Sequence, residues 1–318
     1  MKLKYLLVFI LLTAATAYGQ EEAISWINEN SYALKLDSSS TDDDLSFLSR
    51  ELRGKTVVGL GEASHGTREF YLQKGRIIER LITKEDFKLL SFEFASSFIA
   101  PINQYLQSGQ GDLKELMRPM ALYNTEEIYR LFQWISEYNK NKSTKNKVVL
   151  TGFDNEDFWG NPLTRDKFMA ENIIKSHELK KRKTIIWTHN VHIAKDTTMA
   201  KFPTMGLYLK KHFGKKFYAV GFDTYQGSVN VLNQSRFFEM HTFEGKQNTL
   251  SDIFAKAKYE AFYLSFTTKP SPFTGTTSFI TNIFSNWQEL TPLPIRPGVD
   301  FDGMVFIRNT SASVKLGQ

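Results

Sequence analysis

The stretch KTVVGLGEASHGT, residues 55–67, combines a short strand, a polar loop and the start of a helix. Lys55–Gly61 is a short, largely apolar, β-rich run with the length of a buried strand. A polar loop follows it, and Thr67–Ile82 then carries apolar residues at the spacing of an amphipathic helix. A strand followed by a loop and a helix is the repeating unit of α/β folds, so this stretch predicts that class.

The same alternation continues along the chain. Further strand-like runs are Phe87–Phe94, Lys147–Phe153, Lys183–Thr188, Phe217–Phe222, Ala261–Phe266 and Gly303–Arg308. Further helix-period patterns are Glu21–Leu36, Thr125–Asn139, Thr164–His177 and Met205–Phe213. The strand-like runs are almost continuously apolar, which is typical of strands covered on both faces. We therefore predict an α/β fold with a mostly parallel central sheet, helices on both faces, and an active site at the carboxyl ends of the strands.

The composition excludes several classes of site. The 318 residues are 42% hydrophobic and 23% charged, the mix of an ordinary globular protein, and they include no cysteine. A disulfide framework, a thiol nucleophile, a thiolate zinc site and a lipid-modified cysteine are thereby excluded. The formal net charge of +6 does not indicate a nucleic-acid partner, and the basic clusters Lys140–Lys147 and Lys180–Lys183 are typical of solvated loops.

The first 19 residues have the pattern of a secretory signal peptide. Lys2 and Lys4 precede a short apolar run, and small residues lead to Gly19. The run is too short to span a bilayer comfortably, which takes about 20 apolar residues. We expect a signal peptide at residues 1–19, a single domain over 20–318, a periplasmic or secreted location, and no stable membrane anchor after cleavage.

Polar residues gather where the predicted strands end. They are Glu62, His65, Glu93, Asp154, His189 and His192. Because the carboxyl ends of parallel strands lie along one edge of a sheet, these side chains are expected to share a cleft there.

Glu62 and His65 lie three residues apart in the first of these loops. If the loop turns into a helix near His65, the carboxylate can fix the tautomer of the imidazole and stabilise its charged form. The alternative is a capped turn in which His65 is only a polar loop residue. Lys74 falls on the apolar stripe of the following helix, so it needs an anionic partner, for which Glu62 and Glu93 are candidates, unless it extends past the stripe to water.

The pair His189-x-x-His192 also has two interpretations: two metal ligands, or two polar groups around a substrate carbonyl. The spacing alone does not decide, because zinc sites on helices usually use His-x-x-x-His with an intervening glutamate. Ser64 is not predicted to be a nucleophile, since Glu62 stands where the Gly-x-Ser-x-Gly turn requires its first glycine.

Several of these segments closely resemble the signature blocks of the erythromycin esterase family. The segments are Gly61–Thr67 with Glu69 and Phe70, Lys74, Phe92-Glu93, and His189–His192, with weaker blocks at Met205-Gly206, Tyr218–Gly221 and Phe301–Gly303. The resemblance extends from about Thr56 to Ile307. It implies a hydrolase that cleaves carboxylic esters, such as macrolide lactones, apparently without a metal.

The resemblance also implies roles for individual residues. His65 would be the general base on water, Glu62 would orient it, and Glu93 would hold the water or the imidazole. His189 and His192 would stabilise the substrate carbonyl and its oxyanion, each well-placed donor contributing about 3 kcal/mol. Lys74 stands where the macrolide enzymes carry arginine, and it lacks the bidentate fork. We also place Lys74 and Asp154 among the substrate-binding residues.

The stretch from Glu93 to His189 is shorter than in the macrolide esterases, so the resemblance transfers the hydrolytic centre better than the substrate. We expect no cofactor and a small-molecule ester or lactone as substrate. Two alternatives remain. One is a hydrolase with a divalent metal held by some of Glu62, His65, Glu93, His189 and His192. The other is a non-catalytic relative that binds a hydrophobic ligand in the same pocket.

Overall fold

The structure, a computed structural model, describes residues 19–36, 42–267 and 271–317. Its strands are β1 Tyr32–Ala33, β2 Val57–Leu60, β3 Phe87–Ala95, β4 Val149–Asp154, β5 Lys183–Trp187, β6 Phe217–Leu232, β7 Phe238–Glu244, β8 Ala261–Ser265, β9 Ser278–Ile280, β10 Leu293–Ile295 and β11 Gly303–Thr310. Its α-helices are α2 Leu48–Glu51, α3 Arg68–Lys84, α4 Ser96–Ser108, α5 Leu113–Met117, α6 Glu126–Lys140, α7 Pro162–Lys180, α8 Asn190–Ile193, α9 Met205–Phe213 and α10 Leu250–Ala255. Short 3₁₀ turns are η1 Asp42–Leu45, η2 Ala121–Tyr123, η3 Glu156–Phe158 and η4 Gly214–Lys216.

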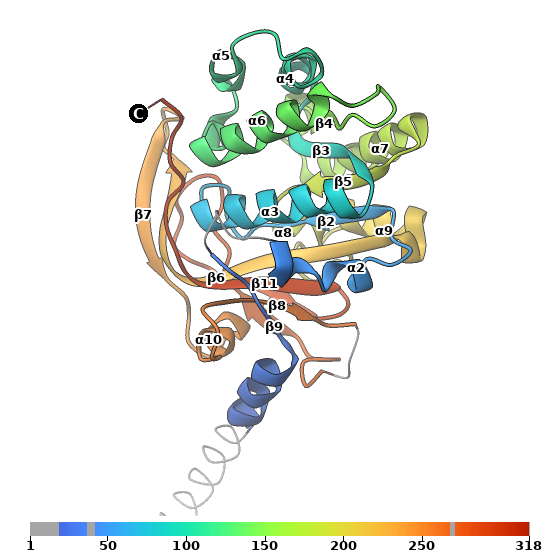
Figure 1. Ribbon diagram of the computed structural model, residues 1–318. Coiled ribbons are helices and arrows are strands. Elements are labelled where there is room, and N and C mark those ends of the chain that lie inside the picture. The colour runs from blue at the N-terminus through green and yellow to red at the C-terminus, as the bar shows by residue number, and fades with distance from the viewer. Residues whose placement is uncertain (1–18, 37–41, 268–270, 318) are drawn as a thin grey trace, which may run out of the picture.

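One large mixed sheet crosses the molecule (Figure 1). Its strands follow the order β1-β8-β11-β6-β2-β5-β3-β4, and β7 pairs with the far half of β6. From β11 to β4 the neighbours run parallel, whereas β8, β1 and β7 pair antiparallel. The parallel strands therefore end along one edge, which supports the predicted α/β class and mostly parallel sheet.

Apolar layers cover the two faces of this sheet. Helices α3, α4 and α6 pack on one face, and α7, α8, α9 and α10 pack on the other (Figure 1). Val58 and Ile185 point into the first layer, while their neighbours Val57 and Ile186 point into the second. Both faces are dry, and this explains why the strands are almost continuously apolar.

All seven predicted strands and the four helices predicted after residue 60 are present. The prediction of a helix over Glu21–Leu36 is wrong at its carboxyl end, because the helix stops at residue 30. Asn30 and Ser31 donate side-chain hydrogen bonds to carbonyls of the last turn, and Tyr32–Ala33 then pairs with β8. The extension of β6 into a hairpin with β7 was not predicted from the sequence.

The predicted signal peptide lies outside the described residues, apart from Gly19, which is helical. Within the part of the chain that the structure describes, no helix has both the length and the apolar character needed to cross a bilayer.

Candidate active site

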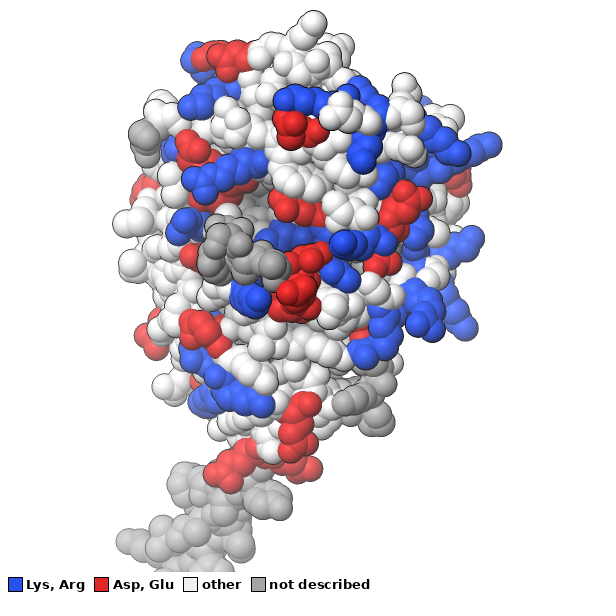
Figure 2. All heavy atoms as spheres, viewed as in Figure 1, with Lys and Arg blue, Asp and Glu red and all other residues white. Residues whose placement is uncertain are grey.

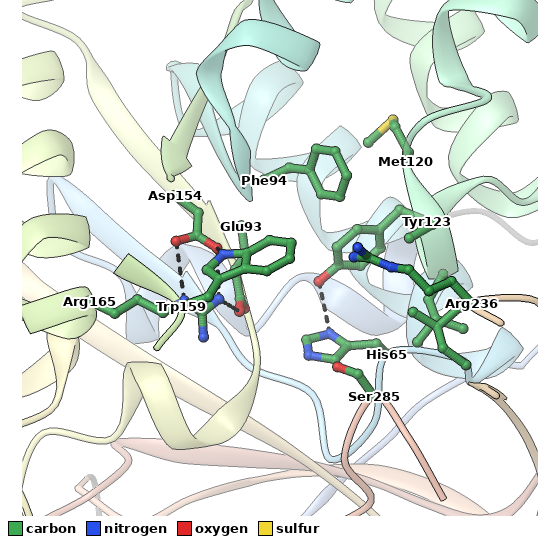
Figure 3. A pocket seen from close by; sticks show the side chains of 13 residues that line it. His65, Glu93, Phe94, Met120, Tyr123, Asp154, Trp159, Arg165, Arg236 and Ser285 are labelled. Carbon is green, nitrogen blue, oxygen red and sulfur yellow. Dashed lines mark hydrogen bonds and ion pairs between the residues drawn. The ribbon is translucent and has the colours of Figure 1, made fainter. Parts of the chain in front are cut away.

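His65 lies in the loop between β2 and α3, and its ring is fixed by Glu62. The Nδ1 atom of His65 is 2.7 Å from Oε1 of Glu62 and 2.9 Å from the hydroxyl oxygen of Tyr123. The Tyr123 hydroxyl donates to the same Oε1 at 3.1 Å, so Nδ1 carries a proton that it donates to Glu62. Figure 3 shows His65 and Tyr123 on one side of a cavity. In the neutral ring, the other nitrogen, Nε2, is then unprotonated and able to accept a proton.

Two glycines allow the loop that carries His65 to pack closely against neighbouring segments. A Cβ atom on Gly61 would lie 2.2 Å from Oδ1 of Asn190, and one on Gly66 would lie 1.8 Å from the carbonyl oxygen of Asn230. Asn190 in turn holds the main chain of Phe222 through both its amide atoms, at 2.7 and 3.1 Å. The ends of β2, β5 and β6 are thereby tied together around the loop that carries His65.

Lys74, on α3, is fully buried and pairs with Glu62. Its Nζ atom is 2.5 Å from Oε2 of Glu62 and 3.2 Å from the carbonyl oxygen of Thr188. The ammonium also lies 4.4 Å from the centre of the Trp187 ring. Burial lowers the pKa of Lys74 to about 8, against the opposing effect of Glu62. The expectation that Lys74 needs an anionic partner is confirmed, and the partner is Glu62.

Glu93, at the end of β3, is held by donors from two other segments. Its Oε2 accepts hydrogen bonds from the Thr188 hydroxyl at 2.7 Å and from the His189 main-chain nitrogen at 2.8 Å. Its Oε1 is 3.0 Å from the Arg165 guanidinium and 3.4 Å from Nε2 of His192. Burial would raise the pKa of Glu93, but electrostatic interactions with His192, His65 and Arg165, together with the hydrogen bond from Thr188, outweigh it and hold the pKa well below its usual range.

Arg165, in the first turns of α7, is the cation of this cluster. Its guanidinium contacts Asp154 at 2.7 Å, Glu93 at 3.0 Å and Nε2 of His192 at 3.0 Å. Asp154 also accepts a hydrogen bond from the Trp159 indole at 2.9 Å. Figure 3 shows Arg165 crossing the floor of the cavity toward Glu93. The carboxylate of Asp154 is thus occupied by Arg165 and Trp159, although Asp154 does line the cavity.

His192 and His189 have different environments. Nδ1 of His192 lies 3.0 Å from the buried carboxylate of Asp166. Burial alone would lower the pKa of His192, but Asp166 and Glu93 outweigh it and raise the pKa. His189 accepts a hydrogen bond at Nδ1 from the Val191 main chain, and burial lowers its pKa well below the usual value.

His189 is therefore a neutral ring with its proton on Nε2. That atom makes no well-formed hydrogen bond to the described residues, although the carbonyl of Ala63 opposes the lowering of the pKa. The ring centre lies 4.9 Å from that of His65. His189 thus presents a buried donor beside the proposed base.

The cavity itself has a volume of about 270 Å³. It is lined by His65, Glu93, Phe94, Met120, Ala121, Leu122, Tyr123, Asp154, Trp159, Arg165, Leu232, Arg236 and Ser285. The predicted residues Glu62, Lys74, His189 and His192 are not part of this lining. Glu62, His189 and His192 contact His65, Glu93 or Arg165 from behind, and Lys74 contacts Glu62. Direct contact of Lys74, His189 and His192 with a substrate stays a prediction.

Arg165, Asp166 and Tyr123 were not predicted to belong to the site. For Arg165, the sequence signal is its position in the first turns of a helix, where a cation opposes the helix dipole unless a carboxylate compensates it. Tyr123 lies in η2, between two helices, where no periodic pattern marks it.

The described residues contain no group of three or more histidines and carboxylates arranged to hold a metal ion. The candidate ligands instead face protein partners. Glu62 is shared by His65, Tyr123 and Lys74, and His192 is placed between Asp166 and Glu93.

The family model described as erythromycin esterase matches residues 82–161 and 155–310. The chain belongs to the erythromycin esterase family. Its fold is also that of the erythromycin esterase EreC, since a mutant of that enzyme in its open conformation superposes with a TM-score of 0.70 at 14% identity, over 91% of this chain and 99% of the other. A protein from Bacillus cereus has a TM-score of 0.82 at 21% identity, over 94% of this chain and 99% of the other.

Two curated relatives match this member of the erythromycin esterase family by sequence. YbfO of Bacillus subtilis (strain 168), which carries a hydrolase name, is 32% identical over 152 residues, covering 46% of this chain and 33% of YbfO. Erythromycin esterase type II of Escherichia coli is 31% identical over 131 residues, covering 41% of this chain and 30% of that enzyme. The match thus spans about a third of the length of each curated relative.

The weaker family blocks, at Met205-Gly206, Tyr218–Gly221 and Phe301–Gly303, make structural contacts between elements. Gly206 begins α9 against α8, where a Cβ atom would lie 2.2 Å from the carbonyl oxygen of Ile193. Asp302 accepts a hydrogen bond from the main chain of Ala219 at 2.8 Å and pairs with Lys195 at 2.7 Å. In this erythromycin esterase family member, the Gly206 block thus packs α9 against α8, and the Asp302 block ties the segment before β11 to β6.

Proposed function

We propose that this hydrolase cleaves carboxylic esters and that His65 activates the attacking water. The observation that carries the proposal is the hydrogen bond from Nδ1 of His65 to Glu62, which leaves Nε2 as the unprotonated nitrogen of a ring that lines the cavity. A general base of this kind contributes about 10²- to 10⁴-fold to the rate.

Glu62 orients the base and stabilises its charged form after it takes the proton. Lys74 supports this role, because its ammonium lies 2.5 Å from Oε2 of Glu62 and holds that oxygen in place. Tyr123 donates to the same carboxylate from the other side. The position of Glu62 beside His65 is therefore fixed by two partners.

We further propose that Arg165 polarises the substrate carbonyl, with Glu93 and His192 fixing its guanidinium. Arg165 lines the cavity, carries a permanent charge and is held on several sides by buried groups. Asp154 would then act by positioning Arg165. His189, whose Nε2–H makes no well-formed hydrogen bond to the described residues and whose ring lies beside His65, is the proposed second donor to the water or the oxyanion.

The size of the cavity favours a small ester group. Pockets for drug-sized ligands usually measure about 300–1,000 Å³, and this one measures about 270 Å³. Phe94, Met120 and Leu232 supply an apolar wall. A small ester or lactone fits this volume, while a macrolide would place most of its ring outside it.

We propose that the reaction needs no metal. The support is the engagement of the candidate ligands with one another and with Lys74 and Arg165, as described above. Elemental analysis of the purified protein tests this directly, and a stoichiometric ion whose removal by a chelator abolishes turnover would overturn it.

We also propose that the chain is exported to the periplasm or secreted, on the strength of its first 19 residues. Fractionation of cells that produce the full chain, with sequencing of the mature amino terminus, tests this. A product that starts at Met1 and stays in the cytoplasm would overturn it.

The decisive experiment uses His65→Asn and a panel of aryl esters, lactones and macrolides. Asparagine keeps an amide donor for Glu62 but cannot act as a base, so turnover should fall by at least about 100-fold with little change in melting temperature. The control is His212→Asn, an exposed histidine paired with Glu178, which should leave turnover unchanged. Full activity of His65→Asn would refute the proposed base. A wild-type protein that binds such compounds without turning any over would favour the non-catalytic alternative.

A further inference from the structure

The edge of the sheet opposite the active site is strongly basic. The segments that lead into β2, β3, β4, β5 and β6 are residues 53–55, 84–88, 137–147, 178–183 and 210–216, and they include the first residues of β3 and β5. Together they hold 16 lysines and arginines and four carboxylates, a net +12, whereas the whole chain has a net +6. The rest of the chain is therefore net negative, and the charge of the molecule is concentrated at the amino ends of its strands. We call these five segments the basic edge.

Neighbouring segments of the basic edge contact one another. The Lys55 ammonium donates to the carbonyl of Lys215 at 2.9 Å. Arg182 donates to the carbonyls of Lys147 and Thr144, and Lys183 donates to the carbonyl of Glu85 at 2.9 Å. The parallel order β6-β2-β5-β3-β4 places all five segments in one row. Figure 2 shows Lys and Arg crowded on the right of the molecule, where α7 and α9 end in Figure 1.

Each of the four carboxylates of the basic edge already has a partner within the protein. Glu178 pairs with His212, Glu137 with Lys140, and Asp86 lies 3.5 Å from Lys88. Glu85 accepts a hydrogen bond from Ser49. Eleven of the 16 cations are exposed: Arg53, Lys84, Lys140, Lys142, Lys145, Lys180, Lys181, Lys210, Lys211, Lys215 and Lys216. Like charges at this density repel one another, so they favour a partner that supplies negative charge.

We propose that the basic edge binds the surface of an anionic phospholipid bilayer. Fourteen of its 16 cations are lysines, compact charges that suit a diffuse layer of phosphate headgroups more than a bidentate site. Leu179, with 74% of its surface exposed, stands next to Lys180 and Lys181, and an apolar side chain among cations is typical of interfacial contacts.

A nucleic acid is the less favoured partner. Single-stranded nucleic acids stack on open aromatic rings, but the rings of the basic edge are covered: Phe213 packs against His177 and His212, and the other two lie under lysines. Lys142 covers Tyr138 at 4.9 Å, and Lys183 covers Phe87 at 5.3 Å. Major-groove readers insert a helix or a ribbon, whereas the basic edge is a row of loops and helix ends.

The orientation follows from the fold. The cavity with His65 lies at the carboxyl ends of the strands, so a molecule that rests on its basic edge presents the cavity away from the bilayer, to soluble substrates. Binding at the basic edge and ester turnover are thus separable, and each can fail without the other.

The test measures co-sedimentation of the purified full chain with vesicles. Vesicles of phosphatidylcholine with about one-third phosphatidylglycerol should bind it, and pure phosphatidylcholine vesicles should bind it far less, so that any contribution of the apolar amino terminus is measured separately. Raising the salt from 0.1 to 0.5 M should weaken binding at least tenfold, because the charges are exposed.

The variant that tests the surface replaces Lys142, Lys145, Lys180 and Lys181 with glutamine. Since each cation near such a surface contributes severalfold to partitioning, binding should fall at least about tenfold. The matched control replaces Lys114, Lys167, Lys246 and Lys256, exposed lysines away from the basic edge, and should bind as the wild type does. Ester turnover should be the same in all three proteins.

Three results would overturn the proposal: equal binding to neutral and anionic vesicles, equal losses in the two lysine variants, or no vesicle binding by the wild type. A further arm uses a fluorescent 20-nucleotide DNA in place of vesicles. Tight, basic-edge-dependent DNA binding together with weak vesicle binding would assign the surface to nucleic acid instead.

Discussion

The two edges of the same sheet treat charge in opposite ways. At the carboxyl edge, the buried Lys74 and the partly buried Arg165 each contact carboxylates at 2.5 to 3.0 Å. At the amino edge, most lysines are exposed, and the few that are held donate to main-chain carbonyls. A buried charge must be paired because its desolvation is expensive, while an exposed one is stabilised by water alone.

The function proposed for the carboxyl edge depends on exact geometry, and the function proposed for the amino edge depends on charge density. At the carboxyl edge, hydrogen bonds fix the distances and tautomers that cleavage of an ester bond requires. Single substitutions there should therefore have large effects on turnover or stability. The amino edge fixes only a density of positive charge, so its lysines should be interchangeable and individually weak. The predictions below test that contrast, beginning with the largest expected effect.

Replacing Lys74 with methionine should lower the free energy of unfolding by about 3–5 kcal/mol, because it leaves the Glu62 carboxylate buried without its cation. The matched control at the amino edge is Lys145→Met, an exposed lysine in a loop, which should change stability by less than about 0.5 kcal/mol. Urea unfolding of both variants measures the two values. Similar values for the two variants would contradict the contrast between the edges.

Replacing Glu93 with glutamine should lower kcat about 100-fold, a change of about 2.7 kcal/mol in the activation free energy. The amide keeps the shape of the side chain but removes the charge that holds Arg165 and His192 in place. KM should change much less, because Glu93 is proposed to act through Arg165. A variant with normal kcat and a raised KM would instead make Glu93 a binding residue.

Lys74 should also make stability depend on pH in the alkaline range. Its pKa in the folded chain is about 8 against 10.5 as the ordinary value, so the unfolded chain binds more protons between these two pH values, and stability rises with pH there. Relative to Lys74→Arg, which stays charged, the wild type should gain about 1 kcal/mol per pH unit between pH 8 and 10. Unfolding curves at pH 7, 8, 9 and 10 measure this, and parallel profiles for the two proteins would show that the pKa of Lys74 is ordinary.

Much of the carboxyl edge could be predicted from local sequence. The strand at residues 57–60 and the loop after it lie within one continuous segment, so the hydrogen bond between Glu62 and His65 follows from a separation of three residues. The inward position of Lys74 follows from helical periodicity in the same way. Local sequence does not predict Arg165, Asp166 and Tyr123 as site residues, because their hydrogen-bond partners come from other helices and strands. The strand order that brings these elements together cannot be deduced from any single segment.

The sequence by itself determined the α/β class, the strands and the polar residues at their ends, because these depend on the pattern of neighbouring side chains. Only the tertiary structure decided which of those residues line the cavity and which support them from behind, since that depends on crossovers between distant strands. The tertiary structure also aligns the basic clusters in a continuous row, although each cluster taken alone has the sequence of an ordinary solvated loop. Parallel pairing is the physical reason for both results: it collects the ends of β2 to β6 on one edge of the sheet and their starts on the other.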